Sequence, residues 1–195
     1  MDHSHSLSPA EALATLGEGN RRYAAGAPLH PRQDLARRAA TLPGQRPMTI
    51  ILGCSDSRVP PEIIFDQGVG DLFVVRTAGH VFDDAVLASV EYAVDHLGVR
   101  LVLVLGHANC GAIAAALSGE TFHGHIGGLV EALRAEGIGA GRHSPDSAER
   151  THVRITAERL RRLPPLLAPL VSSGTVEVHG ALYHLDTGEV EVLAE

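Results

Sequence analysis

The sequence predicts an α/β fold: a mostly parallel central β-sheet of four strands, an antiparallel C-terminal edge strand, and helices on both faces. Short runs of Val, Ile and Leu alternate with segments of helical period, as expected for strands buried on both faces of a parallel sheet. The chain ends with two strand-like runs around Asp186-Thr187-Gly188, which predicts a terminal hairpin. We expect a single domain over residues 1–195, with residues 1–40 as an N-terminal helical arm.

The first helix has a clear start signal. Ser8 precedes Pro9, and Glu11 follows three residues after Ser8, a pattern typical of a helix N-terminus. The helix should run to about Ala25 and stop at Gly26. Its apolar stripe is modest, so we expect it to pack on a partner subunit. A second short helix is predicted over 33–40.

The remaining elements alternate along the chain. Glycines bound the third strand, and Pro164-Pro165 ends the last long helix. The predicted strands are 48–52, 72–75, 99–105, 175–185 and 189–193, and the predicted helices are 83–97, 110–117, 126–133 and 147–163.

Composition excludes several classes of protein. A net charge of -7 argues against a nucleic-acid-binding protein. No apolar stretch approaches the roughly 20 residues that cross a bilayer, so we expect no membrane partner. The first residues lack a basic and an apolar signal region. We therefore expect a cytoplasmic protein whose two cysteines stay reduced and serve metal or redox chemistry.

Both cysteines and one histidine follow strands of the predicted sheet. Cys54 follows the first strand, and His107 and Cys110 follow the third. Ligand sites in parallel sheets form beyond the carboxyl ends of the strands. Two thiolates and one imidazole make a zinc site with one open position, which is typical of a catalytic rather than a structural zinc. The alternative is that each cysteine is an ordinary buried residue.

Asp56 and Arg58 lie beside the first cysteine. On an extended stretch, residues two apart point the same way, so Arg58 can clamp Asp56 in its ionised form. An aimed carboxylate next to the open metal position can accept a hydrogen bond from what binds there. The alternative is a structural ion pair in a loop. The other histidines, His80 set aside, fit no such pattern and are interpreted as surface residues, among them His3, His5, His123 and His125.

Several segments together resemble the β-class carbonic anhydrases. The resemblance is close from about Gln45 to Ala116 and covers the whole chain in general layout. It is carried by the segments Cys54-Ser55-Asp56-Ser57-Arg58-Val59, Glu62-Ile63-Ile64-Phe65-Asp66-Gln67-Gly68, Val74-Val75-Arg76-Thr77-Ala78-Gly79, Glu91-Tyr92-Ala93-Val94 and Gly106-His107 through Cys110-Gly111.

The resemblance implies an enzyme and its site. One Zn²⁺ per subunit would be held by Cys54, His107 and Cys110, with Asp56 and Arg58 as a catalytic dyad. The reaction implied is the reversible hydration of carbon dioxide to bicarbonate and a proton by zinc-bound hydroxide. Because two thiolates offset the metal charge, we expect activity to rise toward alkaline pH.

The resemblance also implies a substrate pocket and an oligomer. Gln45 would donate a hydrogen bond to substrate or bicarbonate, Phe73 and Ala78 would line the pocket, and Gly111 would border the metal. Tyr92 would reach the pocket of a partner subunit, so the protein would be a homodimer, or a dimer of dimers forming a homotetramer.

Two places in the sequence depart from common family patterns. The segment Thr77-Ala78-Gly79-His80 stands where many members read Asn-Ala-Gly-Asn, and Ile51 stands where members with a non-catalytic bicarbonate site have Trp, which favours the plant-type subgroup. Three alternatives stay open: a related enzyme that hydrolyses carbonyl sulfide or carbon disulfide, a non-enzymatic zinc or bicarbonate-responsive interaction protein, and a disulfide-bonded binding domain.

Overall fold

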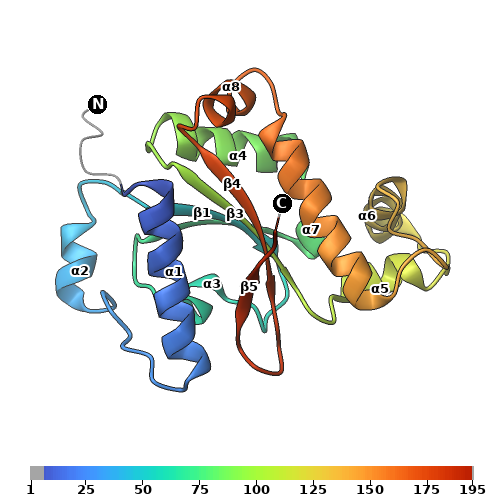
Figure 1. Ribbon diagram of the computed structural model, residues 1–195, viewed down its shortest axis with the longest axis horizontal. Coiled ribbons are helices and arrows are strands. Elements are labelled where there is room, and N and C mark those ends of the chain that lie inside the picture. Colours follow the sequence, from blue (N-terminus) through green and yellow to red (C-terminus); the bar gives the residue numbers. More distant parts are fainter. Residues whose placement is uncertain (1–6, 195) are drawn as a thin grey trace.

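The protein is built around one five-stranded β-sheet, seen in a computed structural model that describes residues 7–194 (Figure 1). The strand order is β2-β1-β3-β4-β5. The first four strands in that order are parallel, and β5 is antiparallel to β4. The predicted fold class is therefore confirmed. The strands are β1 (Thr49–Cys54), β2 (Leu72–Thr77), β3 (Leu101–His107), β4 (Glu177–Tyr183) and β5 (Val190–Val192).

The strands differ in how deeply they are buried. Every residue of β1 and β3 is buried, as expected for central parallel strands. Every residue of β2 is half-buried instead, although the strand includes Phe73, Val74 and Val75. β2 pairs only with β1, so its other edge offers unpaired backbone groups and apolar side chains.

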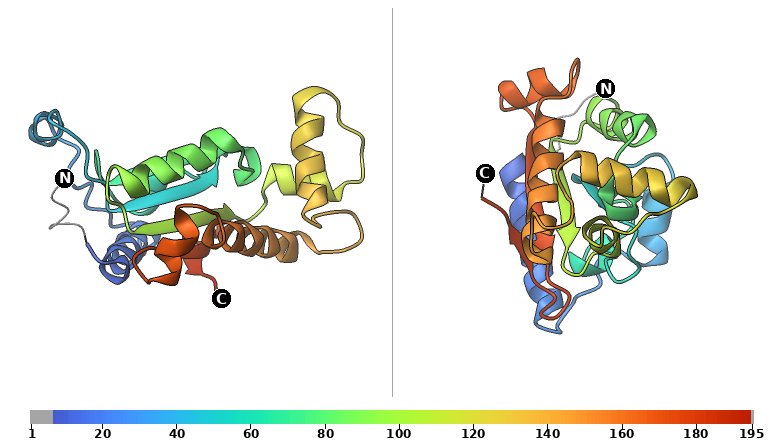
Figure 2. Two further views of the ribbon diagram at one scale, coloured as in Figure 1. Left: turned by 90° about the horizontal axis from the view of Figure 1, so that it is seen from above. Right: turned by 90° about the vertical axis from the view of Figure 1, so that its right-hand side faces the viewer.

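Helices cover both faces of the sheet. Ile50 and Leu52 of β1 pack with α4 (Asp84–Asp95), α7 (Pro145–Arg161) and α8 (Leu167–Ser172). Ile51, which points to the opposite face, packs with α1 (Pro9–Ala24) and α3 (Pro61–Ile64). Two further helices, α5 (Gly111–Leu117) and α6 (Gly124–Ala135), pack on each other, and α6 projects beyond the sheet (Figure 2).

Helix α1 begins where the sequence predicts. The Ser8 hydroxyl accepts from the Glu11 backbone N–H at 3.3 Å, and the Glu11 carboxylate accepts from the Ser8 N–H at 2.9 Å. The apolar stripe of α1 packs on the chain's own core, where Ala12 and Leu16 are buried against the sheet. That α1 also packs on a partner subunit stays a prediction. It concerns the face of the helix that does not contact the sheet.

The rest of the N-terminal arm is held by charge more than by apolar burial. Helix α2 (Leu35–Ala40) has no buried residue, and Leu35 is 73 % exposed. Two buried carboxylates anchor the arm through arginines. Asp66 pairs with Arg22 at 2.6 Å, and Asp71 pairs with Arg32 and Arg37 at 2.6 and 3.0 Å.

The structure differs from the sequence prediction mainly at element ends. The first three strands run two residues further, to Cys54, Thr77 and His107. Backbone ladders continue there because pairing does not depend on the side chain, as in the pairs Cys54↔Thr77 and His107↔Tyr183. Helices α3 and α8 and the 3₁₀ turn η1 (Ala78–His80) were not predicted. Among residues 7–194, no helix is long and apolar enough to cross a membrane.

Candidate metal centre

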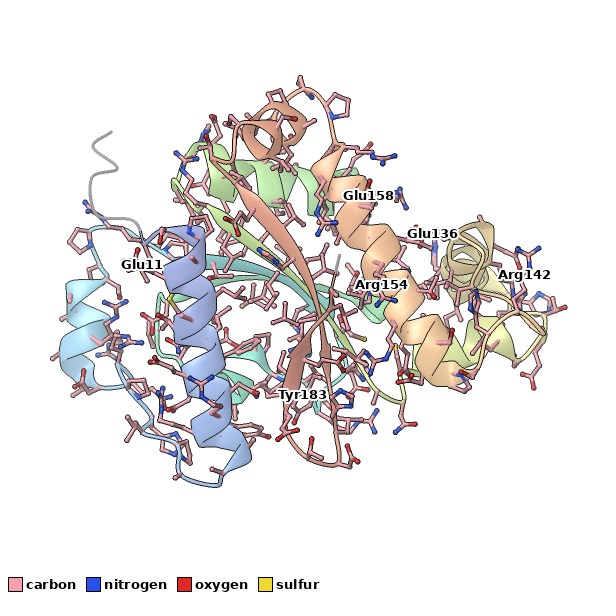
Figure 3. All side chains as sticks on the ribbon, viewed as in Figure 1. Glu11, Glu136, Arg142, Arg154, Glu158 and Tyr183 are labelled. Atoms are coloured by element: carbon pink, nitrogen blue, oxygen red, sulfur yellow. The ribbon has the colours of Figure 1, made fainter. Side chains whose placement is uncertain are left out.

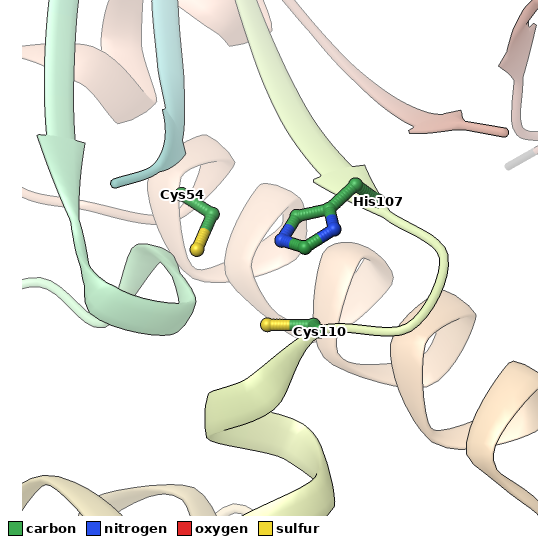
Figure 4. A group of neighbouring side chains, drawn as sticks. All are labelled: Cys54, His107 and Cys110. Carbon is green, nitrogen blue, oxygen red and sulfur yellow. The ribbon is translucent and has the colours of Figure 1, made fainter. Parts of the chain in front are cut away.

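Three side chains meet beyond the carboxyl ends of two neighbouring strands (Figure 4). Cys54 ends β1, His107 ends β3, and Cys110 is the residue that precedes α5. Their ligand atoms all lie within 4.8 Å of one another, and all three residues are buried. The parallel register, with Gly53 opposite Leu105, brings the two strand ends together.

The His107 ring is oriented for metal binding. Its Nδ1 lies 2.9 Å from the Ala108 carbonyl, and because a carbonyl only accepts, the proton is on Nδ1. Its Nε2 is buried and has no hydrogen-bond partner among residues 7–194. A buried nitrogen of this kind is costly unless something binds it. A metal-binding histidine is commonly held in this way through its other nitrogen.

The two cysteines are free thiols and strongly affect each other. A hydrogen bond from Cys110 lowers the pKa of Cys54 to about 4, against the opposing effect of burial. The same hydrogen bond raises the pKa of Cys110. The backbone N–H groups of Ala112 and Ile113 lower it only in part. The hydrogen bond with Cys54 and burial therefore oppose the lowering that the helix start exerts on the pKa of Cys110.

Asp56 and Arg58 form a bidentate ion pair next to these ligands. Arg58 Nε lies 2.9 Å from Asp56 Oδ1, and Arg58 Nη2 lies 2.7 Å from Asp56 Oδ2. The Arg58 hydrogen bonds hold the pKa of Asp56 well below its usual range. Asp56 Oδ2 is 3.9 Å from His107 Nε2. The segment is a turn rather than the extended stretch we expected, and the Arg58 N–H donates to Asp56 Oδ1 at 2.9 Å.

Four hydrogen bonds to or from the backbone hold the loops around the cysteines. Arg76 donates to the carbonyls of Cys54 and Asp56 at 2.8 and 2.5 Å. The Gly79 N–H donates to Cys54 Sγ at 3.3 Å. Glu149 of α7 accepts from the Cys110 N–H at 3.0 Å, and burial raises the pKa of this carboxyl. Sequence reasoning missed Glu149 because a single carboxylate within an amphipathic helix carries no recognisable pattern.

Of the five predicted pocket residues, two lie beside the centre. Ala78 follows Thr77, whose backbone is paired with Cys54, and Ala78 is exposed. Gly111 follows Cys110 and is also exposed, and a Cβ added there would meet nothing within 4 Å. The chain is therefore exposed at these two positions next to the ligands.

The other three pocket residues lie toward the far end of the same strands. Phe73 is in register with Ile50, four residues before the Cys54↔Thr77 pair, which places it roughly 13 Å away along β2. Phe73 and Tyr92 pack together, with ring centroids 6.4 Å apart. Gln45 is exposed and precedes the first residue of β1. Within one chain these residues do not join the metal centre.

One histidine, His152, differs from the surface position expected of it. His152 of α7 is 1 % exposed, and its ring stacks on the buried His80. The sequence interpretation of His152 was wrong because α7 faces the sheet on this side, which a single polar residue in a helical pattern does not reveal. His123 and His125 are exposed as expected, whereas His3 and His5 lie outside the described residues.

Known proteins resemble this chain over most of its length. The model of the carbonic anhydrase family matches residues 49–190. A carbonic anhydrase of Mycolicibacterium smegmatis is 46 % identical over 95 % of this chain and 93 % of its own length. Carbonic anhydrase 2 of Mycobacterium tuberculosis is 44 % identical over 94 % of this chain and 92 % of its own.

Solved structures agree with the sequence matches. A Coccomyxa β-carbonic anhydrase in complex with acetazolamide superposes with a TM-score of 0.74 at 28 % identity, over 94 % of this chain and 86 % of its own. A tetrameric β-carbonic anhydrase of Sordaria macrospora gives 0.72 at 28 % identity, over 81 % and 86 %. With its fold, its Cys-His-Cys cluster and these relatives, the chain belongs to the β-class carbonic anhydrases, a family of enzymes.

Proposed function

We propose that this enzyme catalyses the reversible hydration of carbon dioxide to bicarbonate and a proton, with one Zn²⁺ held by Cys54, His107 and Cys110. The observation that carries the proposal is the cluster of three buried ligand atoms beside a carboxylate that Arg58 holds in place. A structural zinc has no use for such a carboxylate, which argues against a non-enzymatic zinc protein.

The donor set fits zinc. Zinc takes sulfur at about 2.3 Å and imidazole nitrogen at about 2.0–2.1 Å, so ligands around a tetrahedral ion lie roughly 3.5–4 Å apart. The observed atoms, within 4.8 Å of one another, need little movement to reach that spacing. When bound, the ion would lower the pKa of a coordinated water and so supply a hydroxide nucleophile near neutral pH.

Asp56 and Arg58 would orient the reactants. The two hydrogen bonds from Arg58 keep Asp56 ionised, so its carboxylate can only accept hydrogen bonds. Asp56 Oδ2 already lies 3.9 Å from the metal-facing nitrogen of His107. A fixed acceptor at this place would hold the donor hydrogen of the nucleophile and leave its lone pair directed at carbon dioxide.

The pocket would be completed by a second copy of the chain. Gln45, Phe73 and Tyr92 lie far from the ligands of their own chain, whereas Ala78 and Gly111 are exposed next to the ligands. The half-exposed edge of β2 suits contact with another β2. An antiparallel arrangement about a two-fold axis near Val74 and Val75 would place Phe73 of the partner subunit opposite Arg76, toward the metal centre.

Other observations support the same proposal. Tyr92 is 45 % exposed on a single chain, which suits a residue that reaches into a neighbour. The β-carbonic anhydrase of Sordaria macrospora that this chain resembles is tetrameric, which supports assembly of this chain as well. We propose a homodimer, which would allow a dimer of dimers, and a cytoplasmic location, where reduced thiols remain available for zinc.

The test pairs metal analysis with activity. We expect about one zinc per chain and fast CO₂ hydration by the purified protein, with both lost in Cys54→Ser. Carbonyl sulfide and carbon disulfide, assayed alongside, should be poor substrates. A zinc-loaded protein that does not hydrate CO₂, or one faster on a sulfur substrate, would contradict the proposal.

A further inference from the structure

A chain of contacts connects Cys54 to the side chains of His152 and Glu136. His152 Nε2 lies 2.8 Å from the Gly79 carbonyl oxygen, and the Gly79 N–H donates to Cys54 Sγ at 3.3 Å. His152 Nδ1 lies 2.9 Å from Glu136 Oε2, although the alignment is that of an ion pair rather than a directed hydrogen bond. Glu136 lies between the end of α6 and α7 (Figure 3). The proposed reaction uses none of Gly79, Glu136 and His152.

The contact to Gly79 defines the role of the His152 ring. A carbonyl oxygen only accepts, so His152 Nε2 carries a proton and donates it. The N–H and the carbonyl of Gly79 are separated by the two backbone dihedral angles of this residue, φ and ψ. Holding the carbonyl therefore limits the direction in which the N–H points, and this N–H is the group that meets the Cys54 sulfur.

The turn at Gly79 does not adopt an ordinary conformation. Gly79 has φ 60° and ψ 22°, and the next residue, His80, has φ 42°. A left-handed residue other than glycine costs energy and persists where its surroundings impose it. Here the His80 ring stacks on the His152 ring with centroids 4.2 Å apart. His152 thus holds the turn twice, by a hydrogen bond at Gly79 and by stacking at His80.

Helix α7 supports the metal centre at a second place. Glu149, one turn before His152, accepts from the Cys110 N–H at 3.0 Å. Residues three apart lie on one face of a helix, so this face of α7 contacts the segment that carries Cys110 and the η1 turn whose Gly79 N–H meets Cys54. The His152 contact is therefore part of a helix surface turned toward the centre.

We propose that His152 is a positioning residue for the zinc ligand Cys54, acting through the Gly79 peptide; this inference rests on the proposed zinc function. Its Nε2–H holds the turn in which the Gly79 N–H meets the sulfur. That hydrogen bond spreads the thiolate charge and fixes the sulfur orientation. Substituting a group that orients a metal ligand in this way typically lowers metal affinity or activity by 10- to 100-fold.

Two polar substitutions separate this role from simple core packing. In His152→Gln the amide nitrogen takes the place of Nε2 and can still donate to Gly79. In His152→Asn the amide reaches only the place of Nδ1, so the contact with Glu136 can remain while the one with Gly79 is lost. Thr156→Val is the matched control. Thr156 is buried one turn further along α7, and its hydroxyl has no hydrogen-bond partner in the structure.

The primary measurement is zinc affinity by chelator competition. We expect His152→Asn to bind zinc roughly 10- to 100-fold more weakly than the wild type. His152→Gln should stay within a few-fold of it, and Thr156→Val should be unchanged. In the cobalt(II)-substituted proteins, the sulfur-to-metal charge-transfer band should shift in His152→Asn alone. Thermal unfolding of the metal-free proteins reports any general loss of stability.

Each other outcome has a defined meaning. Equal affinity and equal cobalt spectra for His152→Asn and His152→Gln would overturn the proposal, as would an equal loss in Thr156→Val. Should His152→Asn not fold, His80→Ala removes the stacked ring instead, and undiminished zinc affinity in that variant would count against the role. A wild-type protein that binds no zinc would refute the proposed function itself, a result distinct from these.

Discussion

Arg58 holds both carboxylate oxygens of Asp56, with Nε 2.9 Å from Oδ1 and Nη2 2.7 Å from Oδ2, so the carboxylate remains beside the three ligands without joining them. Because the guanidinium supplies these hydrogen bonds, the carboxylate is kept apart from the ligand set.

Removing the Asp56 charge should therefore separate metal binding from catalysis. Asp56→Asn leaves Cys54, His107 and Cys110 in place, so zinc content should match the wild type. The CO₂ hydration rate should fall on the order of 10²-fold, because the amide can donate as well as accept and no longer fixes the nucleophile. Stopped-flow hydration measured together with zinc analysis checks both parts. A variant that lost its zinc would show instead that the carboxylate supports the ligands.

The acid limb of the pH–rate profile should not come from Asp56. Its pKa is held well below its usual range by Arg58, so the carboxylate is ionised at every pH where the protein is assayed. Activity should rise toward alkaline pH in the wild type and in Asp56→Asn alike, because Asp56 is not the group that titrates. Hydration rates collected across pH for both proteins test this. Loss of the acid limb in the variant would assign the titration to Asp56.

A pocket shared between two copies predicts complementation. Cys54→Ser lacks a metal ligand, and the double variant Gln45→Ala with Tyr92→Ala lacks the lining of its neighbour's pocket, so each alone should be inactive. In a mixed dimer one centre receives both defects and the other receives none. Co-expression should restore about a quarter of the wild-type activity.

The control for complementation uses two lesions in one centre. Cys54→Ser mixed with Cys110→Ser leaves no intact ligand set in any dimer, so activity should stay absent. If the first mixture also stays inactive although mixed dimers are recovered, the pocket is built within one chain.

Two leucines, one buried and one exposed, test which helix packs on the chain's own core. Leu16 of α1 is 1 % exposed and packs on the sheet, so Leu16→Ala should cost about 2–5 kcal/mol of unfolding free energy. Leu35 of α2 is 73 % exposed, so Leu35→Ala should change the unfolding of the monomer by less than about 0.5 kcal/mol. Denaturant titration in dilute solution measures both. Equal losses of unfolding free energy would mean that α2 is buried as deeply as α1.

The arm should loosen in acid. Burial raises the pKa of Asp66, but hydrogen bonds from the Leu29 and His30 N–H groups and from Arg22 bring it below its usual range. A carboxyl with a lowered folded-state pKa contributes stability above its unfolded pKa of about 4, and this contribution is lost as pH falls through the folded-state value. Asp66→Asn should destabilise the protein at neutral pH by about 2–4 kcal/mol and reduce the acid-dependent loss.

The control for Asp66→Asn is a substitution in an exposed ion pair. Glu131 is 70 % exposed at its side chain and pairs with Arg134. Glu131→Gln should change stability little at either pH. Comparable effects of the two substitutions would show that the Asp66 pair contributes no more than a surface pair.

Sequence patterns predicted the parts of this protein that depend on periodicity. The Ile-, Val- and Leu-rich runs identified β1 and β3, and the residues after them identified Cys54, His107 and Cys110, because parallel strand ends share one edge of the sheet. The capping box at Ser8 and Glu11 identified the start of α1. These features are local, or follow from the topology of the sheet.

What the sequence did not reveal depends on contacts between distant segments. His152 and Glu149 reach the metal centre only because α7 packs on β3 and β4. The destination of the α1 stripe was also not predictable from its pattern, since an apolar face looks the same whether its own sheet or another subunit covers it. The pKa of Cys110, which precedes α5, depends on Cys54, a residue at the end of β1.

The origin of the three ligands has a consequence for how the enzyme matures. Cys54 ends β1, while His107 and Cys110 follow more than forty residues of chain that include β2 and α4. The ligands come together only when β1 and β3 lie side by side, and parallel strands meet only after the crossover between them has formed. If the chain holds zinc as proposed, a newly made chain cannot bind it with all three ligands before β1 and β3 pair, and zinc uptake would then report that pairing.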